Sequence, residues 1–200
     1  MKRVLSRFIF ILGVTLAATQ GYSQAGYKVK TYNMEVAGTS NLHDWTASVE
    51  KISGTLKVTA ESGKALDIKD VELIFDAKSL KGSKGSIMDS KIKDALKSEK
   101  FPTIQFKLNQ IENTSFQGGT SHIKATGLLT ISGTNRPISL STTGKLLPNG
   151  EIEITGSSKL KMSDFKIDPP TAMLGTLKTA DEVTVTFKLV FQPSMWTTSK

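Results

Sequence analysis

Carboxylates and histidines are the side chains of this 200-residue chain with the most potential for chemistry. Asp164 and Asp168 stand on either side of Phe165 in a stretch typical of a loop, and paired carboxylates are the groups that hydrolyse glycosidic bonds. Asp89 and Asp94 fall in a segment with helical spacing. Helix capping and contact with water account for all four acids. We therefore assign no catalytic residue and predict that the protein is not an enzyme.

Metal and cofactor motifs are missing from the sequence. The two histidines, His43 and His122, belong to different predicted elements and lack the ligand spacing of a metal site. The patterns G-x-S-x-G, H-E-x-x-H, G-x-x-x-x-G-K-S/T and G-x-G-x-x-G are all absent. The chain has no cysteine, which excludes thiol catalysis and cysteine-ligated metals. We expect no metal and no cofactor.

The stretch TSNLHDW, residues 39–45, is more informative because it joins a histidine, an acid and a tryptophan between two predicted strands. In one interpretation His43 and Trp45 line the mouth of a pocket. In the other, Trp45 closes the end of a barrel while Asp44 stabilises the turn. The sequence leaves both interpretations open.

Alternation of apolar and polar residues, typical of strands with one buried face, dominates the rest of the chain. It occurs in residues 27–38, 51–58, 71–76, 103–111, 122–132, 137–141, 151–155 and 182–191, and is least regular in the first. Turn-forming residues separate these segments, which favours antiparallel pairing of neighbours. In the stretch SGTNRP we expect residues 133–135 to reverse the chain and Pro137 to begin the next strand.

One segment departs from this alternation. Apolar residues from Met88 to Leu96 recur at helical spacing, which predicts an amphipathic helix over about residues 86–99. Ser86 and Asp89 have the spacing of a capping box, and Pro102 would stop the helix. The sequence therefore predicts one helix inserted into an all-β chain.

About eight antiparallel strands can form a sandwich or close into a barrel, and an eight-stranded barrel is either filled with side chains or holds one small ligand. Periodicity does not distinguish these options. The positions that we expect to point inward and line a lumen are Phe75, Ile104, Phe106, Leu129, Leu140, Ile154, Phe187 and Leu189.

The N-terminus has the layout of a secretory signal peptide. Lys2, Arg3 and Arg7 precede an apolar run over residues 8–18, which is too short to cross a bilayer core of ~30 Å. We predict a signal peptide over residues 1–25 and a single domain over residues 26–200. Without a cysteine for a lipid anchor, the product is expected to be periplasmic or secreted.

Net charge argues against one class of partner. The whole chain carries +8, and three of its 26 basic residues but none of its 18 acidic residues lie in the first 25, which leaves +5. The lysines are scattered rather than clustered, so nucleic acid is not an expected partner. Transient contact with an anionic membrane surface stays open, as does the oligomeric state, with a homodimer among the possibilities.

Several blocks of the sequence resemble the YceI-like family of exported proteins that bind polyisoprenoid lipids. They are GTSNLHDWTASVEKISGTLKV, VELIFDAKSLKG, DSKIKDALKSEKFPTIQFKLNQI, ATGLLTISGTNRPISLSTTGKL and the C-terminal SDFKIDPPTAMLGTLKTADEVTVTFKLVF. The resemblance covers nearly all of the chain after the signal peptide.

This resemblance implies an eight-stranded, lipocalin-like antiparallel barrel with an apolar lumen. The function that it implies is non-catalytic storage or transport of an isoprenoid lipid such as a prenyl quinone. The alternative from the residues alone is a filled β-sandwich that recognises glycans or proteins.

Overall fold

Strands form most of the computed structural model, which describes residues 25–194. The strands are β1 (Ala25–Ser40), β2 (Trp45–Val49), β3 (Ile52–Thr59), β4 (Asp67–Asp76), β5 (Leu80–Gly82), β6 (Thr103–Gln117), β7 (Thr120–Ile131), β8 (Thr134–Leu146), β9 (Ile152–Lys161), β10 (Thr171–Ala172) and β11 (Leu177–Pro193). The helices are α1 (Ser86–Ala95) and three short 3-10 helices, Ala77–Ser79, Met162–Phe165 and Met173–Gly175. The predicted signal peptide lies outside the described residues except for Ala25, and stays a prediction.

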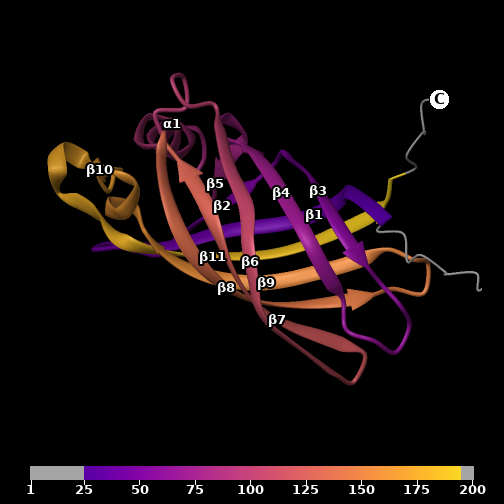
Figure 1. Ribbon diagram of the computed structural model, residues 1–200. Coiled ribbons are helices and arrows are strands. Elements are labelled where there is room, and N and C mark those ends of the chain that lie inside the picture. Colours follow the sequence, from indigo (N-terminus) through magenta and orange to yellow (C-terminus); the bar gives the residue numbers. More distant parts are fainter. Residues whose placement is uncertain (1–24, 195–200) are drawn as a thin grey trace, which may run out of the picture.

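Eight of the strands close into a barrel. They follow one another in the order β1-β3-β4-β6-β7-β8-β9-β11, and β11 pairs with β1 to complete the ring (Figure 1). Each of these pairings is antiparallel. The predicted eight-stranded antiparallel barrel with one inserted helix is therefore confirmed. The closed ring excludes the β-sandwich alternative, because a sandwich consists of two separate sheets.

Strand β1 has different neighbours along its length. Strand β11 pairs with it from Tyr27 to Ser40, whereas β3 pairs only with residues Ala25–Lys28 and β2 only with Glu35–Gly38. Strand β2 then pairs with β5 through Ala47 and Gly82. At this end the wall therefore divides, and the short ribbon β2–β5 diverges from the barrel. Neither short strand was predicted, because β2 and β5 are too short to establish an alternating pattern.

The hairpin between β7 and β8 turns at Ser132 and Gly133, whose φ angles are 49° and 74°. Two successive left-handed residues suit the twist of a tight hairpin. The predicted turn was one residue late, since Thr134 and Asn135 already belong to β8. Pro137 also lies inside β8, but there only β7 is a neighbour because β9 joins from residue 141 onward.

Helix α1 is shorter than predicted. It ends at Ala95, and Lys97 takes a left-handed conformation with φ of 51°, which stops the α-helix before residue 99. The predicted capping box is wrong, because Ser86 is already helical and Gly85 is the N-cap. Asp89 instead accepts a hydrogen bond from the amide of Gly82. Within the described residues, no helix is long and apolar enough to cross a membrane.

The barrel interior is filled at one end. This filled end is where β1 begins and β11 finishes, toward the right in Figure 1. Its largest fully buried side chains are Leu56, Val58, Ile152, Leu189 and Phe191, of which Leu56, Leu189 and Phe191 also border the cavity beyond this end. The hydroxyl of Ser121 is also buried. It accepts a hydrogen bond of 2.9 Å from the amide of Leu66, and this bond holds the β3–β4 loop at this end of the barrel.

Candidate functional site

The other half of the barrel contains a cavity of about 550 Å³. It lies between the filled end and helix α1, and residues of the inward phase of the strands line it. All eight positions predicted to face a lumen do so: Phe75, Ile104, Phe106, Leu129, Leu140, Ile154, Phe187 and Leu189. The structure thus places the predicted set around one space, while contact of these residues with a ligand stays a prediction.

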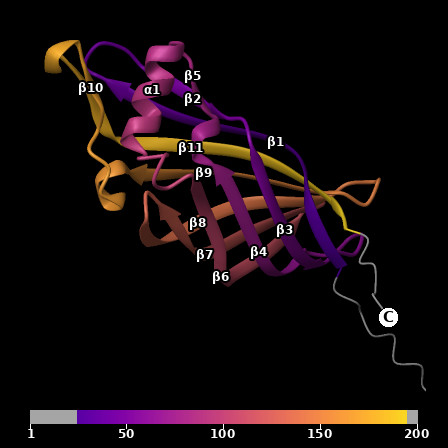
Figure 2. The same cartoon turned by 90° about the horizontal axis from the view of Figure 1, so that it is seen from above.

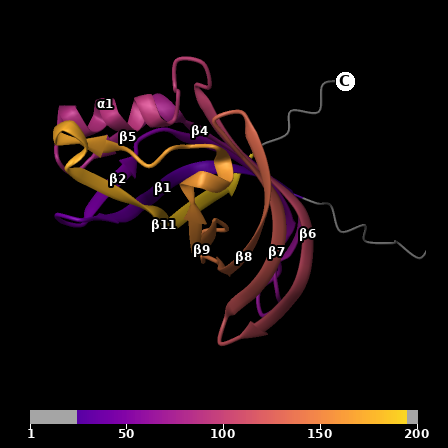
Figure 3. The same cartoon turned by 90° about the vertical axis from the view of Figure 1, so that its left-hand side faces the viewer.

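Helix α1 supplies one wall of the cavity. Its apolar face, from Met88 to Leu96, lines the space, and Ile92, Ala95 and Leu96 of this face also pack against the core. Figure 2 and Figure 3 show the helix lying across the end of the barrel opposite the filled end. The periodicity of the sequence therefore identified this face, but it did not indicate what the face covers.

Part of the lining comes from a segment that sequence analysis treated as a loop. Phe165 and Ile167 are buried and face the cavity, whereas Asp164 and Asp168, which flank this pair in sequence, are exposed. Over residues 164–168 the apolar side chains alternate with charged ones, and this alternation is the sequence signal for an inward-facing segment. In the described part of the chain, no group of three or more histidines and acids could hold a metal ion.

The lining is apolar apart from a few groups. The polar residues are Ser40, His43, Lys84, Lys91, Thr142, Ser158, Lys161, Thr171 and Thr179. Among the described residues that line the cavity, none is an aspartate or a glutamate. A space of this kind favours hydrocarbon over charged or strongly polar ligands, because a polar group moved into it would lose its hydrogen bonds to water.

Trp45 and His43 both line the cavity, and because His43 is exposed to solvent we take this part of the lining as its mouth. The half-buried indole of Trp45 covers Gly38, where a methyl group would overlap the ring. Its Nε1–H donates a hydrogen bond of 3.3 Å to the carbonyl of Thr39. A glycine is thus needed at position 38 for the indole to lie flat on β1, and the imidazole of His43 is exposed nearby.

Ser40, rather than Asp44, stabilises the turn between β1 and β2. Its hydroxyl accepts hydrogen bonds from the amides of Leu42 (3.3 Å) and His43 (3.1 Å) and donates one to the carbonyl of His43 (2.7 Å). The proposed role of Asp44 in the turn is therefore wrong. Asp44 is exposed at the tip.

Polar contacts attach α1 to the ribbon beneath it. The Asp89 carboxylate accepts hydrogen bonds from the amide of Gly82 (2.7 Å) and from Nζ of Lys81 (3.1 Å). The amide of Gly82 is the largest cause that lowers the pKa of Asp89, and the Lys81 ammonium lowers this pKa further. Ionised Asp89 therefore connects the first turn of α1 to β5.

The far end of α1 is attached to the β7–β8 hairpin. The hydroxyl of Ser132 donates a hydrogen bond of 2.8 Å to the carbonyl of Leu96, one residue beyond the helix. The ring of Phe101 packs closely on Gly133 of the same hairpin. The SGTNRP stretch thus supports the helix that covers the cavity.

Arg136 of the same stretch reaches the other side of the mouth. Its Nε–H donates a hydrogen bond of 2.6 Å to the carbonyl of Asp164, in the 3-10 helix that supplies Phe165. Asp181 of β11 attaches this 3-10 helix to the barrel. Its carboxylate accepts hydrogen bonds from the hydroxyl (2.5 Å) and the amide (2.8 Å) of Ser163. These two bonds, the hydroxyl first, lower the pKa of Asp181.

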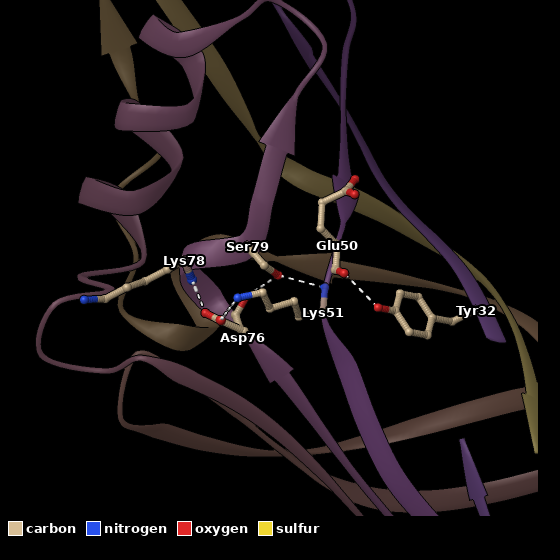
Figure 4. Close-up of polar contacts among 6 residues, drawn as sticks. All are labelled: Tyr32, Glu50, Lys51, Asp76, Lys78 and Ser79. Atoms are coloured by element: carbon tan, nitrogen blue, oxygen red, sulfur yellow. Dashed lines mark hydrogen bonds and ion pairs between the residues drawn. The ribbon is translucent and has the colours of Figure 1, made fainter. Parts of the chain in front are cut away.

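A compact group of polar contacts holds the point where the chain leaves the barrel for β5 and helix α1 (Figure 4). The hydroxyl of Ser79 donates to the carbonyl of Asp76 (2.7 Å) and accepts from the amide of Lys51 (3.0 Å). Beside it, the hydroxyl of Tyr32 donates to the carbonyl of Glu50 (2.7 Å). These bonds join β4, the β2–β3 turn and β1, and so fix the start of β5.

A closed antiparallel barrel around an apolar cavity, with one helix across its open end, is a lipocalin-like barrel. The chain belongs to the YceI-like domain family, whose model matches residues 23–191. A search of curated proteins found no match.

Solved structures share this fold at low sequence identity. BcnA of Burkholderia cenocepacia is 20% identical with a TM-score of 0.61, over 80% of this chain and 95% of that one. A polyisoprenoid binding domain from Saccharophagus degradans, implicated in plant cell wall breakdown, is 12% identical with a TM-score of 0.65, over 86% of this chain and 100% of that one. The YCEI protein of Campylobacter jejuni is 19% identical with a TM-score of 0.58, over 74% of this chain and 85% of that one.

Proposed function

We propose that this protein binds an isoprenoid lipid, such as a prenyl quinone, with its tail in the cavity, and stores or transports it without chemical change. The observation that carries the proposal is the apolar cavity of about 550 Å³, a size typical of small-molecule sites. The similar domain from Saccharophagus degradans is described as binding polyisoprenoids. The family of this chain makes the same ligand class the first to test.

The energetics of an apolar tail support this ligand class. Four isoprene units contain about twenty carbons, and a yield of about −0.3 kcal/mol per heavy atom gives roughly −6 kcal/mol. That free energy corresponds to a dissociation constant of tens of micromolar without any polar contact. We therefore expect tolerance of the head group and selectivity for tail length.

The proposed location of the protein is the periplasm or the exterior of the cell. It rests on the basic head, the short apolar run and the polar exit of residues 1–25. Cell fractionation tests it, and intact protein that retains these residues in the cytoplasm would contradict it.

Quenching of tryptophan fluorescence offers a direct test of ligand binding. The chain has two tryptophans, so Trp196→Phe leaves Trp45 at the cavity mouth as the reporter. Menaquinone-4, with four isoprene units, should quench this fluorescence in a saturable manner. Menadione, which has the same ring without the tail, is the matched control and should quench only weakly. Equal affinity for the two compounds, or no saturable quenching, would contradict the proposal.

A further inference from the structure

Large apolar side chains are exposed at the mouth of the cavity. Among the large apolar residues that the structure describes, the three with the most exposed side chains are Leu174, which is fully exposed, Ile87 at 77% and Leu42 at 65%. Other exposed apolar residues, Ile74, Phe116 and Leu128, reach only 38–44%. We call Leu42, Ile87 and Leu174 the apolar rim.

Each residue of the rim belongs to a segment that also lines the cavity. Ile87 lines the cavity directly, and Leu42 is adjacent to His43, which also lines it. Leu174 lies in the loop between Thr171 and Leu177, which both line the cavity. In Figure 1, Figure 2 and Figure 3 the elements that carry them, the β1–β2 turn, α1 and the loop around β10, gather at one end of the molecule.

Hydrogen bonds hold two of these loops together. The Asn41 side chain donates to the carbonyl of Thr176 (2.8 Å) and accepts from the amide of Lys178 (2.9 Å). The amide of Asn41 also donates to the carbonyl of Lys178 (3.1 Å). The loops that carry Leu42 and Leu174 therefore form one connected surface.

The conformation of Leu174 points to a role outside the fold. Its φ and ψ are 55° and 35°, in the left-handed region where a leucine is costly and a glycine is not. A fully exposed leucine in such a conformation contributes neither packing nor favourable backbone geometry. Strained residues that persist on a surface are candidates for contact with a partner.

Charge around the opening indicates which partner. Lys84, Lys91 and Lys161 line the cavity, as His43 does, and the described lining residues include no acid. All three lysines are exposed, so their methylene stems lie along the apolar mouth while their ammonium groups can remain in water. Exposed carboxylates next to lining residues, those of Asp44, Asp164 and Asp168, oppose this charge in part, whereas the exposed Lys166 between Phe165 and Ile167 adds to it.

We propose that the mouth end of the barrel docks on the surface of an anionic lipid bilayer, with the apolar rim entering the interface and the lysines facing the head groups. Exposed leucine and isoleucine side chains flanked by lysines are the combination that binds anionic membrane surfaces. The cavity opening then faces the bilayer, which gives the lipid of the proposed function a path that avoids water. Docking itself needs no bound lipid.

Vesicle cosedimentation tests this surface separately from lipid binding. The protein should bind vesicles of phosphatidylcholine with 30% phosphatidylglycerol more tightly than vesicles of phosphatidylcholine alone. High salt should remove this difference, because it screens the lysines. The double variant Leu42→Ser/Leu174→Ser should bind the anionic vesicles at least about tenfold more weakly.

A matched control removes as many exposed apolar residues from the side of the barrel. The double variant Ile74→Ser/Leu128→Ser should bind the vesicles like the unmodified protein. Equal binding of the rim variant and the unmodified protein, or an equal loss in both variants, would overturn the proposal.

Leu174→Gly separates docking from folding. Because glycine accepts the left-handed conformation, this variant should keep or raise the melting temperature while vesicle binding falls. A melting temperature that is unchanged together with unchanged vesicle binding would count against the rim. A dimer of the unmodified protein in analytical ultracentrifugation that Leu42→Ser/Leu174→Ser converts to a monomer would overturn the bilayer as partner, because the rim would then be an interface between two copies.

Discussion

The two ends of the barrel are built from the same alternating strands, yet one is solid and the other is hollow. At the filled end, side chains such as Ile152 and Val58 have no exposed surface at all. At the open end, lining residues such as Leu140 are half-buried and face the cavity. Alternation thus decides which face of a strand points inward, but not whether the interior is occupied.

The wall and the type of contact also differ between the ends. At the filled end β1 has barrel strands on both sides, whereas at the open end β2 replaces β3 and the wall divides. Apolar packing holds the filled end, while the hydrogen bonds of Asp89, Ser132 and Asp181 hold the cover of the open end. The filled end therefore provides most of the stability of the barrel, and the open end provides the cavity.

Truncation of a side chain should reveal this difference most strongly. We expect Ile152→Ala to lower the free energy of unfolding by about 2–5 kcal/mol, because it opens a new void in a packed region. The matched change Leu140→Ala borders space that is already empty and should cost less than about 1 kcal/mol. Urea denaturation of the two variants measures both values, and similar costs would contradict the division into filled and open ends.

Added bulk should reduce stability at the filled end and ligand binding at the open end. Val58→Phe overpacks the filled end and should cost about 1–3 kcal/mol, with tail binding preserved in the molecules that remain folded. Leu140→Trp should leave the melting temperature nearly unchanged and reduce menaquinone-4 binding, because the indole occupies the cavity. Loss of stability without loss of binding in Leu140→Trp would place this residue in a packed core instead.

Phe106 combines the properties of Val58 and Leu140, because it both packs closely and lines the cavity. Its ring lies so close to Gly127 that a methyl group there would overlap it, and the same side chain also lines the cavity. Phe106→Trp should therefore cost about 1 kcal/mol and also weaken menaquinone-4 binding. Thermal melting and tryptophan-independent binding by equilibrium dialysis measure the two effects, and a change in only one of them would contradict this intermediate position.

Acid should loosen the open end before the filled end, with a smaller effect than the substitutions above. The pKa of Asp89 is lowered in the folded protein by the Gly82 amide and then by Lys81. A lowered pKa means that this carboxylate stabilises the fold above its unfolded pKa of about 4 and that this contribution disappears as the pH falls through the folded value. Deuterium exchange should therefore increase in α1 relative to β9 between pH 6 and pH 3.

Asp89→Asn provides the control for this pH effect. The variant retains a side-chain acceptor for the Gly82 amide but has no charge to titrate, so the acid-dependent increase in α1 should largely vanish. An increase of the same size in the variant would assign the effect to other groups.

The eight barrel strands, the inward phase of the lumen residues and the existence of the helix were predictable because each depends on local periodicity. The end of the helix was not, since it depends on the left-handed conformation of Lys97. Asp89 was predicted as part of a cap, but it contacts Gly82, which a long-range ladder brings near. The hollow interior and the exposure of Leu174 could not be predicted either, because both depend on how distant segments meet.

The pairing of β1 with β11 has a consequence for how the protein folds. This seam joins Tyr27 to Pro193, so the barrel closes only through contacts between the first and last strands of the domain. Contacts of such sequence separation have a high loop-closure entropy, which makes their formation slow. Until the final strand arrives, β1 and β9 are open edges able to pair with other chains. A chain emerging from a ribosome or a translocation channel therefore remains vulnerable to aggregation until β11 is released.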